Sequence, residues 1–332
     1  MPRLPIAVVI PTRNEAANIV STVRSVIAHF TAVVVVDSES TDDTRELAKA
    51  EGAEVIGYTW DGGYPKKKQW CLDRVRTDID WVLFLDGDET PSGELLAELR
   101  RIFLDGRPVR PAAFDIPLGY WFAGRRLRHG HTIVKRALLD RTRARFPEPA
   151  DLAAPGMGEQ EGHYQPLAEP VYRLRAPIEH RDLDPVRTWF ERHNRYSDWE
   201  AWLECHPAVR EEIRLAKTRQ GQLFHRAPLK PLLSFGYAYV YRRGFLDGRA
   251  GLDYALAMSF YRWQIGLKTR EARAAAPPEA APPAGRDAGG GADADAGAGG
   301  GTGGGGGAGP GLDAATGAGW SGGQPDPGAR DR

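Results

Sequence analysis

The fold is decided by one stretch of the sequence, Trp81-Val82-Leu83-Phe84-Leu85-Asp86-Gly87-Asp88-Glu89, in which an uninterrupted apolar run passes directly into three carboxylates. Such a run predicts a strand that is buried on both faces of a sheet. In open α/β sheets, ligands bind just beyond the carboxyl ends of the strands. Asp86 and Asp88 are therefore predicted to hold a divalent cation, with substrate phosphates completing its ligand shell. A solvated acidic turn before a helix is the alternative.

Strands and helices alternate on the N-terminal side of this stretch. Apolar runs at 4–10, 32–36 and 53–57 predict strands, and the segments between them have the composition of helices. This order predicts an α/β fold with βαβ units and a doubly wound, mainly parallel sheet. Asp37 ends the second run, so its carboxylate is expected at the same edge as Asp86. The first run ends without the Gly-x-Gly-x-x-Gly of dinucleotide-binding domains, which disfavours a nicotinamide or flavin function.

The second half of the chain is less regular. Short strands are predicted between 113 and 146, where seven basic residues form either a solvated face or a contact with anionic lipid headgroups. They are Arg125, Arg126, Arg128, His129, His131, Lys135 and Arg136. The segment 229–268 interleaves aromatic and basic residues, which indicates either contact with a membrane interface or a pair of helices packed on the main domain.

Composition narrows the class of protein. Lys+Arg and Asp+Glu both number 44, so no overall charge favours nucleic acid as a partner. Cys71 and Cys205 lie far apart, which predicts a reducing compartment and no disulfide framework. No signal-peptide pattern opens the chain and no apolar stretch reaches ~18 residues, so we expect a cytoplasmic protein, either soluble or peripheral on the inner membrane. From 271 onward, Ala, Gly, Pro and Asp predict a disordered tail.

Three motifs, each placed after its own predicted strand, resemble a known family. They are Ile10-Pro-Thr-Arg-Asn-Glu15, Asp37-Ser-Glu-Ser-Thr-Asp-Asp43 and Asp86-Gly-Asp-Glu89. In this order they resemble the inverting family 2 glycosyltransferases, which have a GT-A fold. Four further segments are similar to the branch that builds lipopolysaccharide core or exopolysaccharide, namely 60–69, 161–165, 192–197 and 244–248. The resemblance covers the chain from 4 to 268.

The resemblance implies a role for each matching residue on the donor side. Four residues would line the nucleotide pocket, namely Pro11, Thr12, Asn14 and Glu15. Asp37 would accept a hydrogen bond from the base, with uracil favoured, and Ser38 and Asp42 would lie beside it. Lys68 or Gln69 would reach the donor from the far side. Asp86 would contact the ribose or the metal, and Asp88 would bind the Mg²⁺ or Mn²⁺ that bridges the diphosphate.

Transfer with inversion also needs a carboxylate that takes the proton of the acceptor hydroxyl. Glu161 is favoured because its glycine-bounded turn is expected to leave it accessible and because the matching family segment centres on it; Glu159 is the second candidate. A surface acidic loop is the plainer interpretation. Contacts with the acceptor or a phosphate are predicted for His163, His180, Arg192 and Arg195, with simple helix packing as the alternative.

The sequence therefore predicts a metal-dependent, inverting glycosyltransferase that uses a nucleotide-diphosphate sugar, with a UDP-sugar favoured, and a lipid-linked, lipopolysaccharide or exopolysaccharide acceptor. The predicted regions are a GT-A domain at 1–225, with a nucleotide-sugar half at 1–110 and an acceptor half at 111–225, a helical appendage at 226–270 that contacts the membrane in one interpretation, and the tail at 271–332. A non-catalytic polysaccharide-assembly scaffold is one alternative. A nucleotidyltransferase is less favoured, because the first loop lacks the glycines that hold a triphosphate.

Overall fold

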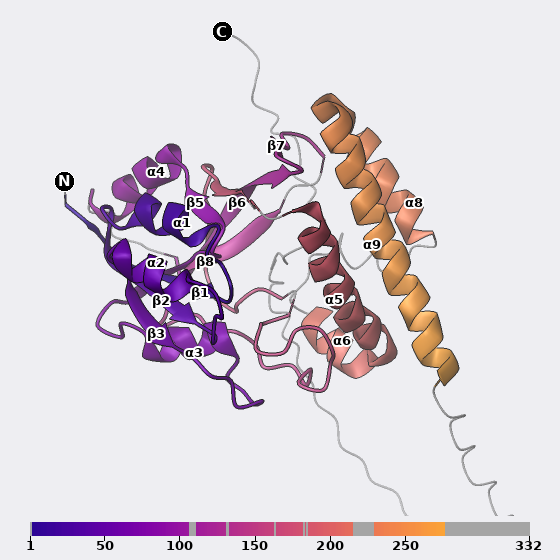
Figure 1. Cartoon of the computed structure of the whole chain (residues 1–332), viewed down its shortest axis with the longest axis horizontal. Helices are drawn as coiled ribbons and strands as arrows, with labels where there is room; N and C mark the ends of the chain where they lie inside the picture. Colours follow the sequence, from indigo (N-terminus) through magenta and orange to yellow (C-terminus); the bar gives the residue numbers. More distant parts are fainter. Residues whose placement is uncertain are drawn as a thin grey trace, which may run out of the picture.

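The computed structural model describes residues 2–105, 111–130, 133–162, 164–181, 183, 185–214 and 229–275. In this part of the chain a twisted sheet carries helices on both faces, and a group of further helices packs at one side (Figure 1). The predicted α/β fold is confirmed. The predicted disordered tail falls largely on 276–332, outside the described residues.

The N-terminal half alternates strictly between strands and helices. Its elements are β1 (Leu4–Thr12), α1 (Ile19–Val26), β2 (Phe30–Asp37), α2 (Thr44–Ala50), β3 (Glu54–Gly57), α3 (Lys67–Arg74) and β4 (Trp81–Phe84). The four strands run in the order β3-β2-β1-β4, and all neighbours are parallel. Thr12 lies opposite Asp37 in the register of β1 and β2. The carboxyl ends of these strands therefore meet at one edge, as the sequence predicts.

Alternate residues of the central strands enter two different cores. Val8 and Ile10 pack with α1, α2 and α4 (Gly93–Phe103) on one face of the sheet. Val9 packs with Cys71 and Leu72 of α3 on the other face. This explains why β1 and β2 are apolar without alternation, because both of their faces are covered.

The second half of the sheet adds antiparallel pairs to the parallel strands of the first half. Its elements are β5 (Glu89–Pro91), β6 (Ala113–Phe122), β7 (Arg125–Arg126), β8 (Val134–Asp140), β9 (Val171–Arg173) and β10 (Ile178–His180). β8 pairs antiparallel with both β4 and β6, while β10 pairs parallel with β6 and antiparallel with β5. Because β8 runs antiparallel to β4, the first residues of β8 lie near the carboxyl end of β4.

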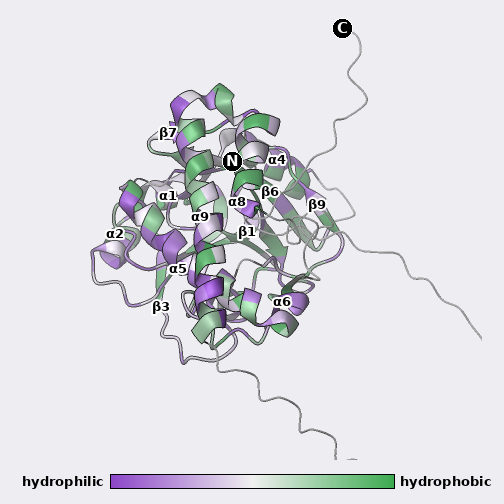
Figure 2. Cartoon of the chain, turned by 90° about the vertical axis from the view of Figure 1, so that its right-hand side faces the viewer, coloured by the Kyte–Doolittle hydropathy of each residue, from purple (hydrophilic) through white to green (hydrophobic). Residues whose placement is uncertain are grey.

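The remaining elements form a helical layer on the side opposite β3 (Figure 1). They are α5 (Val186–Cys205), α6 (Pro207–Arg214), α8 (Lys230–Phe235), the π-helical turn η1 (Gly236–Tyr241), the 3₁₀ turn η2 (Gly244–Asp247) and α9 (Gly248–Ala275). Figure 2 looks onto this layer, where hydrophobic and hydrophilic residues mix along α9.

The structure describes one of the two boundaries that were predicted for the helical appendage. α9 runs to Ala275, so the boundary predicted at 270/271 falls inside a helix, and the boundary at 225/226 lies outside the described residues. Trp189 of α5 shares an apolar cluster with Phe122 of β6 and Tyr254 of α9, so the predicted appendage is packed on the main body. No helix in the described ranges is long and apolar enough to span a membrane.

Candidate active site

A cavity of about 420 Å³ opens at the carboxyl edge of β1 and β4. It is lined by residues from both halves of the chain. The predicted site residues among them are Pro11, Thr12, Glu15, Lys68, Asp86, Asp88, Glu159, Glu161, His180 and Arg192. Six further predicted residues do not line it, namely Asn14, Asp37, Ser38, Asp42, Gln69 and Arg195. His163 lies outside the described residues.

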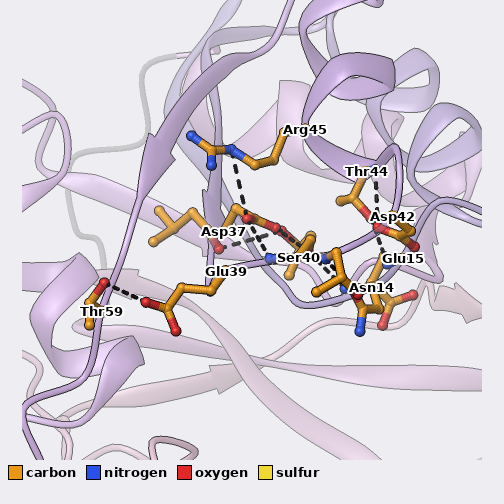
Figure 3. Close-up of polar contacts among 12 residues, drawn as sticks. Asn14, Glu15, Asp37, Glu39, Ser40, Asp42, Thr44, Arg45 and Thr59 are labelled. Carbon is orange, nitrogen blue, oxygen red and sulfur yellow. Dashed lines mark hydrogen bonds and ion pairs between the residues drawn. The ribbon is translucent and has the colours of Figure 1, made fainter.

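The loops after β1 and β2 are tied to each other by hydrogen bonds (Figure 3). Asn14 has a left-handed φ of 58°, its N–H donates to Ser40 Oγ at 2.8 Å, and its Oδ1 accepts from the Thr41 N–H at 2.8 Å. The Ala16 N–H donates to Asp42 Oδ2 at 3.1 Å. Although burial would raise the pKa of Asp42, hydrogen bonds from Thr44 and Ala16 hold it below its usual value. Asn14 and Asp42 therefore shape the loops that border the cavity.

Asp37 is fully buried beneath these loops. Its Oδ1 accepts from the Ser40 N–H at 3.0 Å, and its Oδ2 accepts from Thr12 Oγ1 at 3.2 Å and from the Ser40 hydroxyl. Arg45 Nε lies 3.9 Å away. The structure thus gives Asp37 a task that the sequence did not predict, the anchoring of the β2 loop, and contact with a base stays a prediction.

Two lysine side chains lie close to the carboxylates that follow β4. Lys135 of β8 lies 2.9 Å from Asp86 Oδ2 and 2.6 Å from Glu89 Oε2. Lys68 Nζ lies 3.5 Å from Asp86 Oδ1. Burial would raise the pKa of Asp86, but the charges of Lys135 and Lys68 outweigh it and hold the pKa far below its usual value. Asp86 is consequently ionised and paired with the protein's own cations.

Asp88 faces a different basic group. His180, the last residue of β10, places Nδ1 3.4 Å from Asp88 Oδ1 and 3.7 Å from Glu89 Oε1. Burial would lower the pKa of His180, but the negative charge of Asp88 and the carboxylate of Glu89 raise it to about 9. Its buried Nδ1 has no hydrogen bond of good geometry. An imidazole nitrogen and a carboxylate oxygen are thus aimed at each other across a narrow space.

The turn that carries these carboxylates requires its glycine. A Cβ on Gly87 would lie 2.7 Å from Cγ of Glu15, and the Gly87 carbonyl accepts from Thr22 Oγ1 at 2.6 Å. Close approach of the first loop to the β4 turn is therefore possible only without a side chain at this position. The contact links Glu15 to the carboxylate group through packing.

Glu161 is placed at the N-terminal end of α3. Its Oε1 accepts from the Gln69 N–H at 3.0 Å, and its Oε2 is buried without a hydrogen-bond partner. Burial raises the pKa of Glu161 above its usual value, against the opposing charge of Lys68. Glu161 is half-buried and lines the cavity, while the Gln69 N–H in the first turn of α3 holds one of its carboxylate oxygens. Its role as the base stays a prediction.

Glu159 forms an ion pair with Lys67 at the start of α3. Its Oε1 lies 3.6 Å from Lys67 Nζ, which also donates to the Thr12 carbonyl at 2.9 Å. Burial lowers the pKa of Lys67, against the opposing charge of Glu159. The loop that carries both glutamates is anchored further by a buried ion pair, Lys66 to Asp151, at 2.8 Å. Glu159 therefore belongs to the link between α3, β1 and this loop.

Aromatic side chains form the wall of the cavity opposite the first loop. The Tyr120 ring stacks on His180 with centroids 5.0 Å apart, and its hydroxyl accepts from Trp189 Nε1 at 3.0 Å. The next turn of α5 adds Arg192, His193 and Tyr196. Arg195 is exposed and points elsewhere. Of the predicted pair of arginines, only Arg192 faces the cavity.

Comparison with known proteins fits this geometry. Residues 7–155 match the family model described as Glycosyl transferase family 2. This segment is similar to the glycosyltransferases of family 2. It contains β1 to β4 with the first loop, Asp37 and the Asp86–Asp88 turn, whereas Glu161, His180 and α5 lie beyond the matched range.

Glycosyltransferases that are similar to this segment match it over part of their own length. An uncharacterized glycosyltransferase of Rickettsia prowazekii is 38% identical over 122 residues, which cover 36% of this chain and 40% of that protein. Its counterpart in Rickettsia felis is 40% identical over 116 residues, covering 34% and 39%. The chain thus spans less than half the length of these relatives. The solved structure of glucosyl-3-phosphoglycerate synthase from Mycobacterium tuberculosis with Mn²⁺, UDP and glucosyl-3-phosphoglycerate is 27% identical over 37% of this chain and 46% of that chain, with a TM-score of 0.27.

The sequence missed two groups of residues around the cavity. Lys135 was assigned to a surface basic cluster, although it lies between Asp86 and Glu89. Tyr120 and Trp189 also line the cavity, and no sequence motif singles them out as site residues. An alternation of polar and apolar residues in 134–140 could have placed Lys135 on one face of the sheet. The segment shows no such alternation, because nearly all of this strand is buried.

Proposed function

We propose that this chain moves a sugar from a nucleotide-diphosphate sugar, with a UDP-sugar favoured, to an acceptor hydroxyl with inversion at the anomeric carbon. The proposal rests above all on one observation: Asp86, Asp88 and Glu89 meet Lys68, Lys135 and His180 at the carboxyl edge of the sheet, inside a cavity. A cavity of about 420 Å³ is of the size that holds a small-molecule ligand.

The donor set at Asp88 suits a divalent cation. A carboxylate oxygen and an imidazole nitrogen without a hydrogen bond face each other at 3.4 Å, and both are ordinary ligands of Mn²⁺ once the imidazole has released its proton. No three acidic, histidine or cysteine side chains in the described ranges converge into a complete metal site. This agrees with a cation that is shared with a diphosphate, because Mg²⁺ and related ions take part of their shell from substrate phosphates. Asp88 and His180 would hold the ion, which stabilises the leaving diphosphate as a Lewis acid.

The chain's own residues account for the remaining charges and for the proton. The ammonium of Lys68 is partly exposed to the cavity and can pair with a phosphate oxygen. In the transfer, the acceptor oxygen forms a bond to the anomeric carbon while the bond from that carbon to the diphosphate oxygen breaks. The proton of the acceptor hydroxyl passes to the carboxylate of Glu161. The raised pKa of Glu161 makes this carboxylate a stronger base.

We further propose that the acceptor is lipid-linked, or part of a lipopolysaccharide or exopolysaccharide, and that the chain works at the cytoplasmic face of a membrane. The aromatic wall of Tyr120, Trp189 and Tyr196 supports an acceptor that is at least partly apolar. Arg192 on the same wall would hold an anionic group of the acceptor.

A donor screen tests the proposed function. Full-length protein is heated with a panel of nucleotide-sugars, with and without Mn²⁺, and the matching donor should raise its Tm, since a ligand that binds only the folded state stabilises it. The stabilising donor is then tested for transfer and for slow hydrolysis. A chain that no donor stabilises and that releases no nucleoside diphosphate under any of these conditions is not a glycosyltransferase of this kind.

A further inference from the structure

Helix α9 has two apolar faces, and only one of them is covered. Tyr254, Tyr261 and Ile265 belong to the face that packs against α5 and the end of β6. A second stripe stays exposed, formed by Leu256 (50% exposed), Phe260 (45%), Trp263 (45%) and Leu267 (43%). Their spacing of four, three and four residues puts them on one side of the helix. A helix that packs on a domain by one face normally turns polar residues outward, so this second stripe needs a partner.

The exposed surface continues onto the segment before α9. α8 packs beside α9, and the Ser259 hydroxyl donates to the Pro231 carbonyl at 2.8 Å. Both helices face the viewer in Figure 2. We call their exposed apolar residues the α8–α9 face: Leu229, Leu232, Leu233, Val240, Tyr241, Phe245, Leu246, Leu256, Phe260, Trp263 and Leu267. Exposed apolar residues that gather on neighbouring helices mark an interaction site, whereas scattered apolar residues do not.

The charge of this region identifies the kind of partner. Residues 229–275 contain eight Lys and Arg against three Asp and Glu, a net charge of +5 in a chain whose formal net charge is zero. Arg243, Arg249 and Arg270 are exposed. Basic residues around apolar and aromatic side chains match a membrane interface with anionic headgroups. Two copies of this chain that paired through the same surface would bring two positive regions together, which disfavours a dimer.

The α8–α9 face is connected to the cavity by a chain of aromatic rings. Trp189 lines the cavity, and its ring centroid lies 5.1 Å from that of Phe190. Phe190 contacts Phe260 at 6.4 Å, and Phe260 stacks on Trp263 at 5.4 Å. The wall of the cavity and the exposed stripe of α9 are therefore joined by ring-to-ring contacts.

From these observations we infer that the α8–α9 face is the surface by which the chain lies on a bilayer that contains anionic lipids. Trp263 and Phe260 enter the boundary between headgroups and acyl chains, and the surrounding arginines contact the headgroups. This inference deepens the proposed function. It rests on that function only where a lipid-linked acceptor is taken to reach the cavity along these aromatic side chains.

The test is co-sedimentation of the full-length protein with vesicles, with no donor or acceptor present. Vesicles of equal parts phosphatidylglycerol and phosphatidylcholine are compared with vesicles of phosphatidylcholine alone. We expect binding to the anionic vesicles, weaker binding to the neutral ones, and a decrease on addition of salt. The double variant F260S/W263S should lower the partition onto anionic vesicles by about tenfold or more.

The matched control removes apolar side chains of equal exposure elsewhere. Leu167 is 43% exposed and Tyr172 is 50% exposed, and the variant L167S/Y172S should bind like the original protein. L256S/L267S is a second variant of the stripe, in case the first alters folding, and circular dichroism melting verifies each protein. Absence of binding to anionic vesicles, or unchanged binding by both stripe variants, overturns the inference. A dimer in sedimentation that F260S/W263S dissociates would assign the face to a second copy and overturn it as well. Because the assay contains no donor, lost transfer with retained vesicle binding would contradict only the proposed function.

Discussion

The carboxyl edge of the sheet and the α8–α9 face differ in which side chains they bury and which they expose. At the edge, charged groups are held close together inside the protein, with Lys135 between Asp86 and Glu89 and His180 against Asp88. On α8 and α9, apolar side chains lie outside, surrounded by exposed arginines. Charges that are buried and apolar groups that are exposed both cost free energy, so each indicates a ligand or surface that compensates.

The difference also separates two kinds of substitution. A change at the edge should alter chemistry or stability, because each charge there has a close partner. A change on the α8–α9 face should leave stability almost unchanged and alter only attachment. The following variants test the first half of this statement, and the vesicle experiment tests the second.

The largest effect is expected for Asp88→Asn. This change removes a negative charge at the proposed metal site, and transfer should fall by about 100-fold or more, the loss typical of removing one electrostatic group from an active site. Transfer rates with and without Mn²⁺ measure it. Asp78→Asn is the matched control, because Asp78 is a surface carboxylate 2.7 Å from Arg76, and its loss should leave transfer within about twofold. Full transfer by folded Asp88→Asn would mean that Asp88 has no part in catalysis or in metal binding.

The largest effect on stability is expected for Lys135→Met. Removal of this ammonium leaves Asp86 and Glu89 without their nearest cation, and the free energy of unfolding should fall by about 3 to 5 kcal/mol. Lys68→Met is the comparison, since Lys68 is more exposed and lies 3.5 Å from Asp86; its loss should cost about 1 kcal/mol or less. Urea unfolding compares the two. Equal losses of stability in the two variants would mean that Lys135 contributes no more to the stability of the folded chain than the more exposed Lys68.

A third prediction concerns pH in a metal-free buffer. The pKa of His180 is raised to about 9 in the folded chain, above its ordinary value near 6.5. A raised pKa contributes stability that is fully present below pH 6.5 and is lost as the pH rises through 9. The free energy of unfolding should therefore fall between pH 7 and pH 9.5 by up to about 3 kcal/mol, with about 1.4 kcal/mol for each pKa unit. In His180→Gln this part of the decrease should vanish, and a parallel decrease in both proteins would contradict the assignment.

The smallest effect is expected at Asn14. Its side chain links the two donor-side loops and its φ is 58°. Asn14→Gly removes the hydrogen bond and tolerates this backbone, and should cost about 1 kcal/mol. Asn14→Ala adds the penalty of a left-handed residue and should cost about 1 kcal/mol more. Thermal unfolding and the KM for the donor measure both changes. Equal effects of Gly and Ala would show that backbone conformation has no part in the link.

The sequence predicts the first of the two regions better than the second. Val33 to Val36 and Trp81 to Leu85 are continuous apolar runs, and this local pattern correctly placed Asp37 and Asp86 at one edge. The antiparallel return of β8, which opposes Leu83 to Leu138, depends on pairing between distant segments and gives no local signal. For that reason Lys135 was placed on the surface. Likewise, the two apolar stripes of α9 can be read from the sequence, but which of them is covered is decided by α5 and β6.

The central claim is that the carboxyl edge holds a nucleoside diphosphate together with a metal ion. Calorimetric titration of UDP into the full-length protein, with and without Mn²⁺, tests it most directly. We predict binding of UDP that Mn²⁺ strengthens in the original protein, and loss of this strengthening in Asp88→Asn. If neither UDP nor another nucleoside diphosphate binds, with the metal or without it, the claim is wrong.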